Sequence, residues 1–450
     1  MTGTRLPSIT RRCLPAALAF ACLATAARGE DLLQIYREAQ KQDPTIASAR
    51  SQWEATQENV PQARASLLPQ LSAQGQANAN NYDSTLNTNP KINVSQQYGF
   101  GNLTFSASQP LYRPQNVIAL DQAREQVVQS DFTLGIAQQD LIIRTATAYF
   151  DVLLAEYNVE LAQQQKKAVS EQLAQAKRNF EVGTATITDT NEAQAKFDQI
   201  TATEIQAQND LDNRRTALMA IIGRMPKSLK RVGRGFEPPL PDPNNVDYWV
   251  NRALKENLSV RSAQSNYEIA SLEVDRARAG HLPTLDAVAS AGLTTQSAST
   301  TSDLGGNTRQ SLLGIVLNVP IYTGGFVNSR VRQAISLQDK ARADLEFAKR
   351  TAVTNAQDGF TGVKSAAASV RAFEQAVASA EVALQSNILG QEVGIRTNLD
   401  VLNVQQDVYS TRRDLANAYF TYLIAVLRLK SAIGDLTEQD LEAINRRLNG

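Results

Sequence analysis

The sequence has 450 residues, a formal net charge of +0 and an aromatic content of only 6%, and its length allows two or three ordinary domains. The neutral balance argues against a nucleic-acid binder, because such proteins usually carry a basic patch. One histidine, His281, and two cysteines, Cys13 and Cys22, are too few soft ligands for a zinc or iron–sulfur site. Outside the first thirty residues no Cys/His pair is available for nucleophilic catalysis, so we expect no catalytic site, metal or cofactor.

Residues 1–27 are typical of a signal peptide. Three arginines precede an apolar run from Cys13 to Ala24, and small residues up to Ala27 offer a cleavage site. The run is about a dozen residues, shorter than the ~20 that a membrane-spanning helix needs. Lipid attachment at Cys22 is a weaker alternative. Cleavage removes both cysteines, and a cysteine-free exported chain fits the periplasm or outer membrane of a Gram-negative cell.

The rest of the chain contains two copies of one unit, predicted at residues 28–224 and 247–435. Matching residues recur in unchanged order, at an offset that drifts only between 210 and 214. A Pro-rich linker, 225–246, joins the units, and residues 436–450 form a C-terminal tail. The matched residues are Ala39, Lys41, Ala49, Ala63, Arg64, Ala65, Pro69, Leu71, Pro110, Tyr112, Val182, Gly183, Thr186, Asp189, Gln194 and Gly223 with Ala253, Lys255, Ala263, Ala277, Arg278, Ala279, Pro283, Leu285, Pro320, Tyr322, Val393, Gly394, Thr397, Asp400, Gln405 and Gly434.

Each unit is predicted to begin with a helix of about thirty residues, near 43–68 in the first copy and 257–282 in the second. Two alternating segments follow in each copy and indicate strands, because a period of two places every other side chain on one face. In the first copy the odd positions from Leu71 to Ala77 are apolar or small. In the second copy the odd positions from Leu313 to Ile321 are apolar. The polar stretches 78–93 and 294–308 are predicted to be loops.

A very long helical region ends each unit. Residues 115–225 and 326–450 contain no proline, and good helix formers dominate both stretches. Breaks at Gly183 and Gly394 divide each region into helices of about 67 and about 37 residues. The longer helix would span ~100 Å. The opening helix and the closing helix of a unit together have about the same length as the long helix, so the two can lie end to end beside it. Each unit is therefore predicted to be a long antiparallel pair that carries a β-hairpin. A soluble coiled-coil rod is disfavoured, because a rod needs no strands.

The mature sequence has no run of ~18 apolar residues for a spanning helix, and a closed β-barrel is the other form that spans a bilayer. Four strands are too few to close a barrel, since about eight is the smallest number that works, so several chains must contribute. Tyr112 and Tyr322 are predicted to end equivalent strands as membrane-interface aromatics. The alternative is that they are ordinary strand-end tyrosines of a soluble sheet.

The ordered motifs of this chain resemble those of the TolC family of outer-membrane efflux and secretion ducts. The resemblance covers nearly all of the mature sequence. It is carried by 63–71, by the Pro-(Leu/Ile)-Tyr elements at 110–112 and 320–322, by 393–402, and by 431–437. It implies a mainly α fold with β: a homotrimer with a twelve-stranded outer-membrane barrel in lipid, four strands per chain, above a long periplasmic helical tube. The linker and the C-terminal residues would form an equatorial region.

The same resemblance implies partners and a gate. The partners are a periplasmic adaptor (membrane fusion) protein and an inner-membrane pump of the ABC or RND type, which supplies the energy. At the helix tips, Asp189 and Thr188 match the family's partners for an arginine, which Arg396 matches. Asp400 matches a constriction-lining aspartate. The sequence departs from the family at two further gate positions, where Asn403 replaces an acidic residue and Gln391 replaces a tyrosine, so we expect one acidic ring and a weaker latch.

Two other classes remain for comparison. A periplasmic coiled-coil adaptor is the main alternative, although the Gly- and Val-rich strands of its extra domain are not found. An enzyme is disfavoured by the residue counts, but counting alone leaves carboxylate catalysis open. Type I protein secretion and drug efflux use the same duct, so both remain open as the exported cargo.

Overall fold

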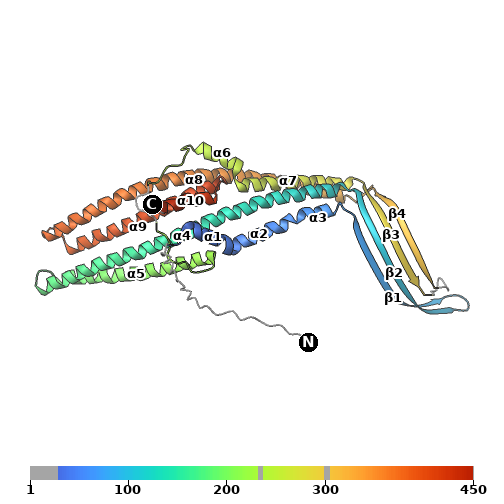
Figure 1. The fold of residues 1–450 in the computed structure, drawn as a ribbon, viewed down its shortest axis with the longest axis horizontal. Coiled ribbons are helices and arrows are strands. Elements are labelled where there is room, and N and C mark those ends of the chain that lie inside the picture. The colour runs from blue at the N-terminus through green and yellow to red at the C-terminus, as the bar shows by residue number, and fades with distance from the viewer. Residues whose placement is uncertain (1–28, 232–236, 298–304, 449–450) are drawn as a thin grey trace, which may run out of the picture.

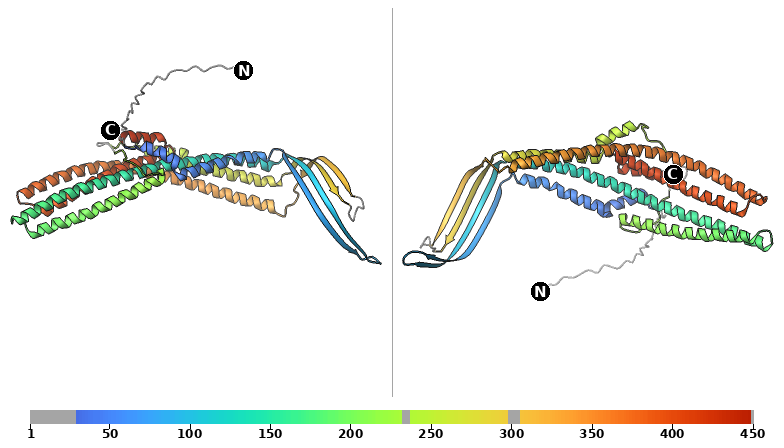
Figure 2. Two further views of the ribbon diagram at one scale, coloured as in Figure 1. Left: turned by 60° about the horizontal axis from the view of Figure 1, so that its bottom comes forward. Right: turned by 180° about the vertical axis from the view of Figure 1, so that it is seen from behind.

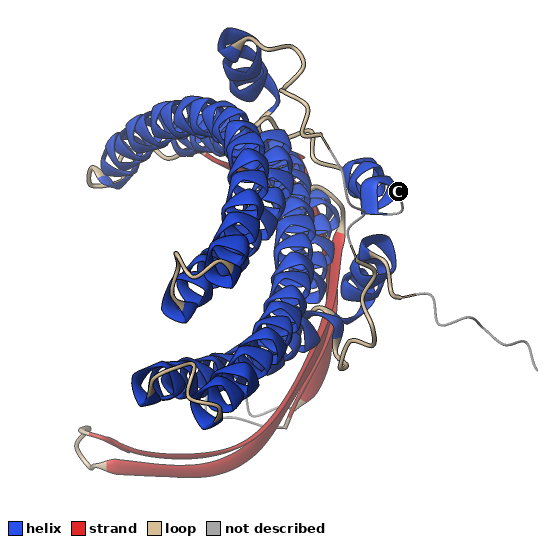
Figure 3. Cartoon of the chain, turned by 90° about the vertical axis from the view of Figure 1, so that its left-hand side faces the viewer, coloured by secondary structure: helices blue, strands red, loops and turns tan. Residues whose placement is uncertain are grey.

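The computed structural model describes residues 29–231, 237–297 and 305–448 of an elongated chain. Helices make up most of its length, and one four-stranded sheet forms the opposite end (Figure 1). The predicted signal peptide lies outside the described residues, as does part of the predicted loop 294–308. Seen along the long axis, the helices form a single curved wall (Figure 3).

The sheet is antiparallel and has the order β1-β2-β3-β4. Its strands are β1 (Gln70–Leu86), β2 (Ile92–Tyr112), β3 (Thr284–Gln296) and β4 (Gly306–Asn318). Both units therefore contribute a hairpin to one continuous sheet, since β2 of the first pairs with β3 of the second. In the described part of the chain, the outer edges of β1 and β4 have no partner strand.

Two strand boundaries differ from the prediction. The predicted loop 78–93 is wrong, because β1 continues to Leu86, β2 starts at Ile92 and only 87–91 connect them. Its polar residues still pair through the backbone, from Asn78↔Phe100 to Leu86↔Ile92, and backbone pairing does not require apolar side chains. At the other end, β4 stops at Asn318, so Tyr322 lies beyond it. Pro320 has no N–H to continue the ladder.

The long helices agree with the prediction. They are α4 (Pro114–Glu181, 68 residues), α5 (Ile187–Ile222, 36), α8 (Phe326–Glu392, 67) and α9 (Asn398–Ala432, 35). Each unit folds back on itself, so that α5 lies beside α4 and α9 beside α8 (Figures 1 and 2). Among the described helices, none combines the length and the hydropathy that crossing a membrane requires.

The opening helix of each unit is shorter than predicted. In the first unit it is divided into α2 (Pro44–Gln57) and α3 (Asn59–Ala65), with the break at Glu58. Pro61 explains this break, because its ring blocks the carbonyl of Gln57 four residues earlier and removes one helical hydrogen bond. The second unit has α7 (Leu258–Arg278), followed by a 3₁₀ turn, η1 (Ala279–His281).

Three short helices were not predicted: α1 (Leu32–Gln42), α6 (Val246–Glu256) and α10 (Glu438–Leu448). The first two are equivalent, because each has 11 residues and precedes the opening helix of its unit. All three lie midway along the long helices rather than at either end (Figure 1). This is the equatorial position that the family resemblance implies for the linker and the C-terminal residues.

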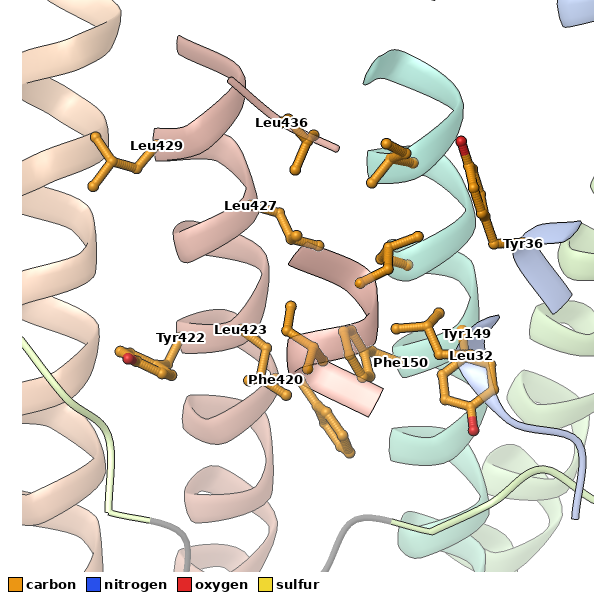
Figure 4. Packing of buried hydrophobic residues seen from close by; sticks show 14 of the residues in the cluster. Leu32, Tyr36, Tyr149, Phe150, Phe420, Tyr422, Leu423, Leu427, Leu429 and Leu436 are labelled. Atoms are coloured by element: carbon orange, nitrogen blue, oxygen red, sulfur yellow. The ribbon is translucent and has the colours of Figure 1, made fainter. Parts of the chain in front are cut away.

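The largest hydrophobic core also lies at this level (Figure 4). The rings of Phe150 on α4 and Phe420 on α9 stack with their centroids 5.4 Å apart. The buried Tyr149 hydroxyl shares its single proton between the carbonyl oxygens of Lys230 (2.9 Å) and Glu30 (3.2 Å). The core therefore joins both units and holds the start of the described chain against the linker.

The two units connect their sheet strands to their long helices differently. Arg113 is the only residue between β2 and α4, and its Nε and Nη2 donate to the carboxylate of Asp286 on β3 (2.8 and 2.6 Å). Seven residues, 319–325, connect β4 to α8. They end in Gly324 and Gly325, whose φ angles of +62° and +82° lie in the left-handed region.

Candidate gate at the helix tips

The tips of both helix pairs lie together at the end of the chain opposite the sheet (Figures 1 and 2). The first tip is the turn 182–186 between α4 and α5, and the second is the turn 393–397 between α8 and α9. Gly183 and Gly394 adopt left-handed φ angles of +78° and +81°, which glycine reaches without steric cost. The glycine breaks predicted from the sequence are therefore the two tips.

The two turns share one hydrogen-bond pattern. In the first, the amides of Thr184 and Ala185 donate to the carbonyl of Asn179 (2.8 and 3.2 Å). In the second, the amides of Ile395 and Arg396 donate to the carbonyl of Gly390 (2.9 and 3.1 Å). Such bonds satisfy carbonyl groups that a helix leaves unpaired at its C-terminus. The tips are thus short, internally bonded turns, and the internal duplication extends to their backbone.

Asp189 and Asp400 have the same structural role, since each completes a capping box at the start of the returning helix. The Asp400 carboxylate accepts hydrogen bonds from the backbone N–H and the hydroxyl of Thr397, both at 2.9 Å. Asp189 accepts the equivalent pair from Thr186 at 2.8 Å. The bonds from Thr397, together with the positive charge of Arg396, hold the pKa of Asp400 below its usual value.

Arg396 is exposed beside the C-terminus of α8. A Cβ atom added at Gly390 would lie 2.8 Å from its Cγ, so the stem of Arg396 crosses that helix closely. Within the described part of one chain, the charge of Arg396 acts on Asp400 of its own tip, and no ion pair joins Arg396 to Asp189. The predicted latch therefore needs a contact between neighbouring chains, and it stays a prediction.

The other predicted gate residues also lie near the tips. Thr188 is exposed in the first turn of α5, and Asn403 is exposed on α9. Gln391 donates from its side-chain amide to Oδ1 of Asn398 (3.3 Å), which links the two sides of the second tip. Nothing in the sequence pattern predicts this bond.

A second contact missed from the sequence joins the two helix pairs. Lys196 on α5 donates from Nζ to Oε1 of Gln406 on α9 (3.2 Å). The two residues are 210 positions apart, and neither stands out in the sequence. This bond places α5 and α9 beside each other a few turns behind the tips.

The predicted interface tyrosines are at the opposite end, where the sheet meets the helices. Tyr112 is the last residue of β2, and Tyr322 lies in the connection from β4 to α8. Both side chains are exposed. In the described residues, no group of three or more His, Cys, Asp or Glu side chains is placed to hold a metal ion.

Comparison with known proteins identifies one family. The chain matches the model for outer membrane efflux proteins over residues 35–224 and 249–435, one segment within each of the two predicted units. It is 33% identical over 431 residues to outer membrane protein TolC of Vibrio cholerae, with 96% of each chain covered. It is 31% identical over 416 residues to the alkaline protease secretion protein AprF of Pseudomonas aeruginosa, covering 92% of this chain and 86% of that one.

Solved structures show the same fold at low identity. The Campylobacter jejuni CmeC outer membrane channel has a TM-score of 0.76 at 16% identity, with 93% of this chain and 89% of that chain covered. The structure of CusC has a TM-score of 0.75 at 16% identity, with 95% and 98% covered.

Proposed function

Since the chain belongs to the outer membrane efflux protein family, we propose that it forms the exit duct of a tripartite export machine, for type I protein secretion or drug efflux. Its location is the outer membrane of a Gram-negative cell, with the helices extending into the periplasm. The duct is passive and acts as a homotrimer with a periplasmic adaptor and an inner-membrane ABC or RND pump. Relatives of both kinds match, a protease secretion protein and an efflux protein, so both cargo classes are retained.

The observation that carries this proposal is the sheet with two open edges. Three chains would supply twelve strands, with β4 of each chain beside β1 of the next, and close a barrel without a free edge. A periplasmic adaptor, the alternative function, does not need a sheet that closes into a membrane barrel. The matched relatives also include proteins named as outer membrane proteins.

The two faces of the sheet support the same assembly. Odd-numbered positions form an apolar face, on which Phe105 is 57% and Leu313 88% exposed. Even-numbered positions are mostly polar, and on this face Asn102 donates to Oγ1 of Thr294 (2.9 Å) while Thr104 donates to Oδ1 of Asn102 (2.8 Å). An outward apolar face and an inward polar face are what a water-filled membrane barrel requires.

The assembly can be tested directly. Protein extracted from the outer membrane in mild detergent should have the mass of a trimer by light scattering, and it should form conducting pores in planar bilayers. Unheated samples should migrate as a heat-sensitive trimer on a gel. A stable monomer that retains its full strand content would contradict the proposal.

Asp400 should set the ion selectivity of the pore. Three Asp400 carboxylates around one axis would favour cations, so Asp400→Asn should reduce cation preference and block by multivalent cations in bilayer recordings. The amide still accepts the Thr397 hydrogen bond, which preserves the helix cap.

The pH dependence has a defined sign. Within one chain the hydrogen bonds from Thr397 and the charge of Arg396 lower the pKa of Asp400, whereas the other two carboxylates of the ring act in the opposite direction. The cation preference of the parent should be lost as the pH falls and the ring is protonated, and Asp400→Asn should remove this pH dependence. Selectivity that is unchanged by Asp400→Asn would place the constriction elsewhere.

The latch is tested best through Arg396. An exposed ion pair contributes only about 0–1 kcal/mol, but three symmetric copies act together on one closure. We expect Arg396→Ser to raise single-channel conductance and sensitivity to large antibiotics, while the protein stays trimeric.

The capping box dictates the control for this experiment. Asp189→Ala removes the proposed partner of Arg396, but it also removes the N3 carboxylate of the capping box that starts α5, and so weakens that end of the helix. Thr186→Val weakens the same cap and leaves the carboxylate in place. If Thr186→Val opens the channel as much as Asp189→Ala, the effect comes from the cap. If Arg396→Ser conducts like the parent, the latch assignment is wrong.

A further inference from the structure

The β1–β2 hairpin extends well beyond the rest of the sheet (Figures 1 and 2). Pairing between β2 and β3 starts at Phe100↔Gln296, and Ser297 still bonds the backbone of Gly99. Beyond that level β1 and β2 pair only with each other, from Asn80↔Tyr98 to Leu86↔Ile92. We call this two-stranded projection, residues 80–98, the ribbon. It continues from the end of the sheet that faces away from the helices.

The apolar side of the hairpin changes where the ribbon begins. In the four-stranded part of the sheet, nearer to the helices, the odd positions of β1 and β2 are apolar, as in the pairs Ala73↔Phe105 and Gly75↔Leu103. In the ribbon the odd positions are all polar, and the apolar residues occupy even positions. The β1–β2 register is continuous through this region, so no slip explains the change. The even positions of the paired strands hold the apolar residues Tyr82, Leu86, Ile92, Val94 and Tyr98 together with the polar residues Asn80, Ser84 and Gln96, and the odd positions hold only the polar residues Asn81, Asp83, Thr85, Asn93, Ser95 and Gln97.

The even side is the inner side of the curved sheet. Val94, Gln96 and Tyr98 are half-buried although no other layer covers them, whereas Ser95 and Gln97 are exposed. Lower in the sheet, the polar face that would line the lumen is formed by the same parity, with Asn102 and Thr104. The apolar side of the ribbon therefore faces the channel axis rather than the lipid.

An apolar side that faces the axis above a membrane would meet water unless it has a partner. In a trimer the nearest such partner is the same side of the two other ribbons. The one acidic residue of the ribbon, Asp83, lies on the outer side, and Lys91 lies in the terminal turn, so no charge opposes close approach on the inner side.

The dimensions permit this contact. Twelve strands spaced about 4.8 Å apart and tilted by about 40° enclose a barrel with a radius of roughly 12 Å. The ribbon, with seven residue pairs, is roughly 24 Å long at about 3.4 Å per residue. It is longer than the barrel radius, so three ribbons that lean inward can meet on the axis.

We propose that the three ribbons of a trimer converge over the external mouth of the channel, with their inner apolar sides in contact, and form a second constriction at the end opposite the helix tips. The proposal rests on the trimeric duct proposed above. Each ribbon thus has a second copy of this chain as its partner.

Cysteine cross-linking tests the contact. Both native cysteines, Cys13 and Cys22, fall in the predicted signal peptide, so one introduced cysteine reports on its own position. Val94→Cys should form disulfide-linked pairs of chains in the purified trimer, because a disulfide needs Cβ atoms within about 4.5 Å. Ser95→Cys, the next residue and on the outer side, is the matched control and should stay unlinked. Oxidation should lower single-channel conductance for Val94→Cys alone, and reduction should restore it.

A charge variant tests closure without cross-linking. Val94→Asp should raise conductance roughly two-fold or more, because three carboxylates at the axis repel one another, whereas Ser95→Asp should conduct like the parent. Light scattering is done first on each variant. A monomeric parent would refute the proposed duct itself. A trimer in which Val94→Cys stays unlinked, or links no better than Ser95→Cys, would refute only the external constriction.

Discussion

Gly434→Ala is expected to destabilise the chain far more than Gly223→Ala, although the two glycines are equivalent in the duplicated units. Both follow the second helix of their unit with left-handed φ angles, +78° for Gly434 and +77° for Gly223. A Cβ at Gly434 would overlap the carbonyl oxygen of Glu256, which is backbone and cannot move aside alone. A Cβ at Gly223 would approach only the side chain of Gln42, at 3.5 Å.

The comparison separates two costs. Alanine in the left-handed region costs about 1–2 kcal/mol, and both variants share this loss. Gly434→Ala adds an overpacking cost of about 1–3 kcal/mol or more, since α9 and the α6–α7 connection must move apart. Urea or thermal unfolding of the trimer, followed by far-UV circular dichroism, measures both variants. Equal losses would show that the close approach to Glu256 is unimportant.

Arg144→Met is expected to be similarly severe, because it leaves a buried carboxylate without its counter-charge. Asp43 is 2% exposed and accepts from Nη1 of Arg144 (3.0 Å) and from the backbone N–H of Ile46 (2.9 Å), where it caps α2. Removing one partner of a buried ion pair costs about 3–5 kcal/mol. The Arg144 side chain is partly exposed to solvent, so we expect the loss in unfolding free energy to lie in the lower part of that range.

The loss should depend on pH. Burial raises the pKa of Asp43, but the hydrogen bonds from Arg144 and Ile46 outweigh burial and lower it overall. In the parent, the stability that comes from this lowered pKa is present above the ordinary aspartate pKa and is lost as the pH falls through the lowered value. Without Arg144, burial raises the pKa, and protonation then relieves the unpaired charge. The difference between parent and Arg144→Met should therefore be smaller at pH 4 than at pH 7.

The second unit provides the control for this prediction. Asn257 replaces the aspartate there, and Asn355 stands at the position that matches Arg144. Asn257 accepts from the amides of Ser259 and Val260 (2.9 and 3.1 Å) and donates to the carbonyl of Ala432 (2.8 Å). The double variant Asp43→Asn with Arg144→Asn should recover most of the stability lost in Arg144→Met. Failure to recover it would mean that packing by the arginine stem, rather than charge, is what matters.

The sequence was sufficient for the features that depend on local chemistry. Long proline-free stretches predicted the helices within a few residues, and Gly183 and Gly394 located both tips. The polar composition of the ribbon predicts a loop, because backbone pairing stabilises its strands and polar side chains do not reveal such pairing. The spacing Thr-x-x-Asp also predicts the capping role of Asp189 and Asp400, a role that the family resemblance does not imply.

Contacts across long sequence distances could not be predicted in the same way. Asp43 and Arg144 are 101 positions apart, and Arg113 and Asp286 are 173 apart. Each of these residues is ordinary in its local sequence, and only the packing of different helices and strands brings them together.

The unequal connections between sheet and helices have a mechanical consequence. With Arg113 alone between β2 and α4, and its guanidinium anchored to Asp286 on the adjacent strand, torque applied to α4 passes directly into the sheet. The connection from β4 to α8 is longer and contains two consecutive left-handed glycines, so it constrains the angle between α8 and its strand less tightly. If the tips open, we therefore expect the α8–α9 pair, which carries Arg396 and Asp400, to turn relative to the sheet more than the α4–α5 pair does.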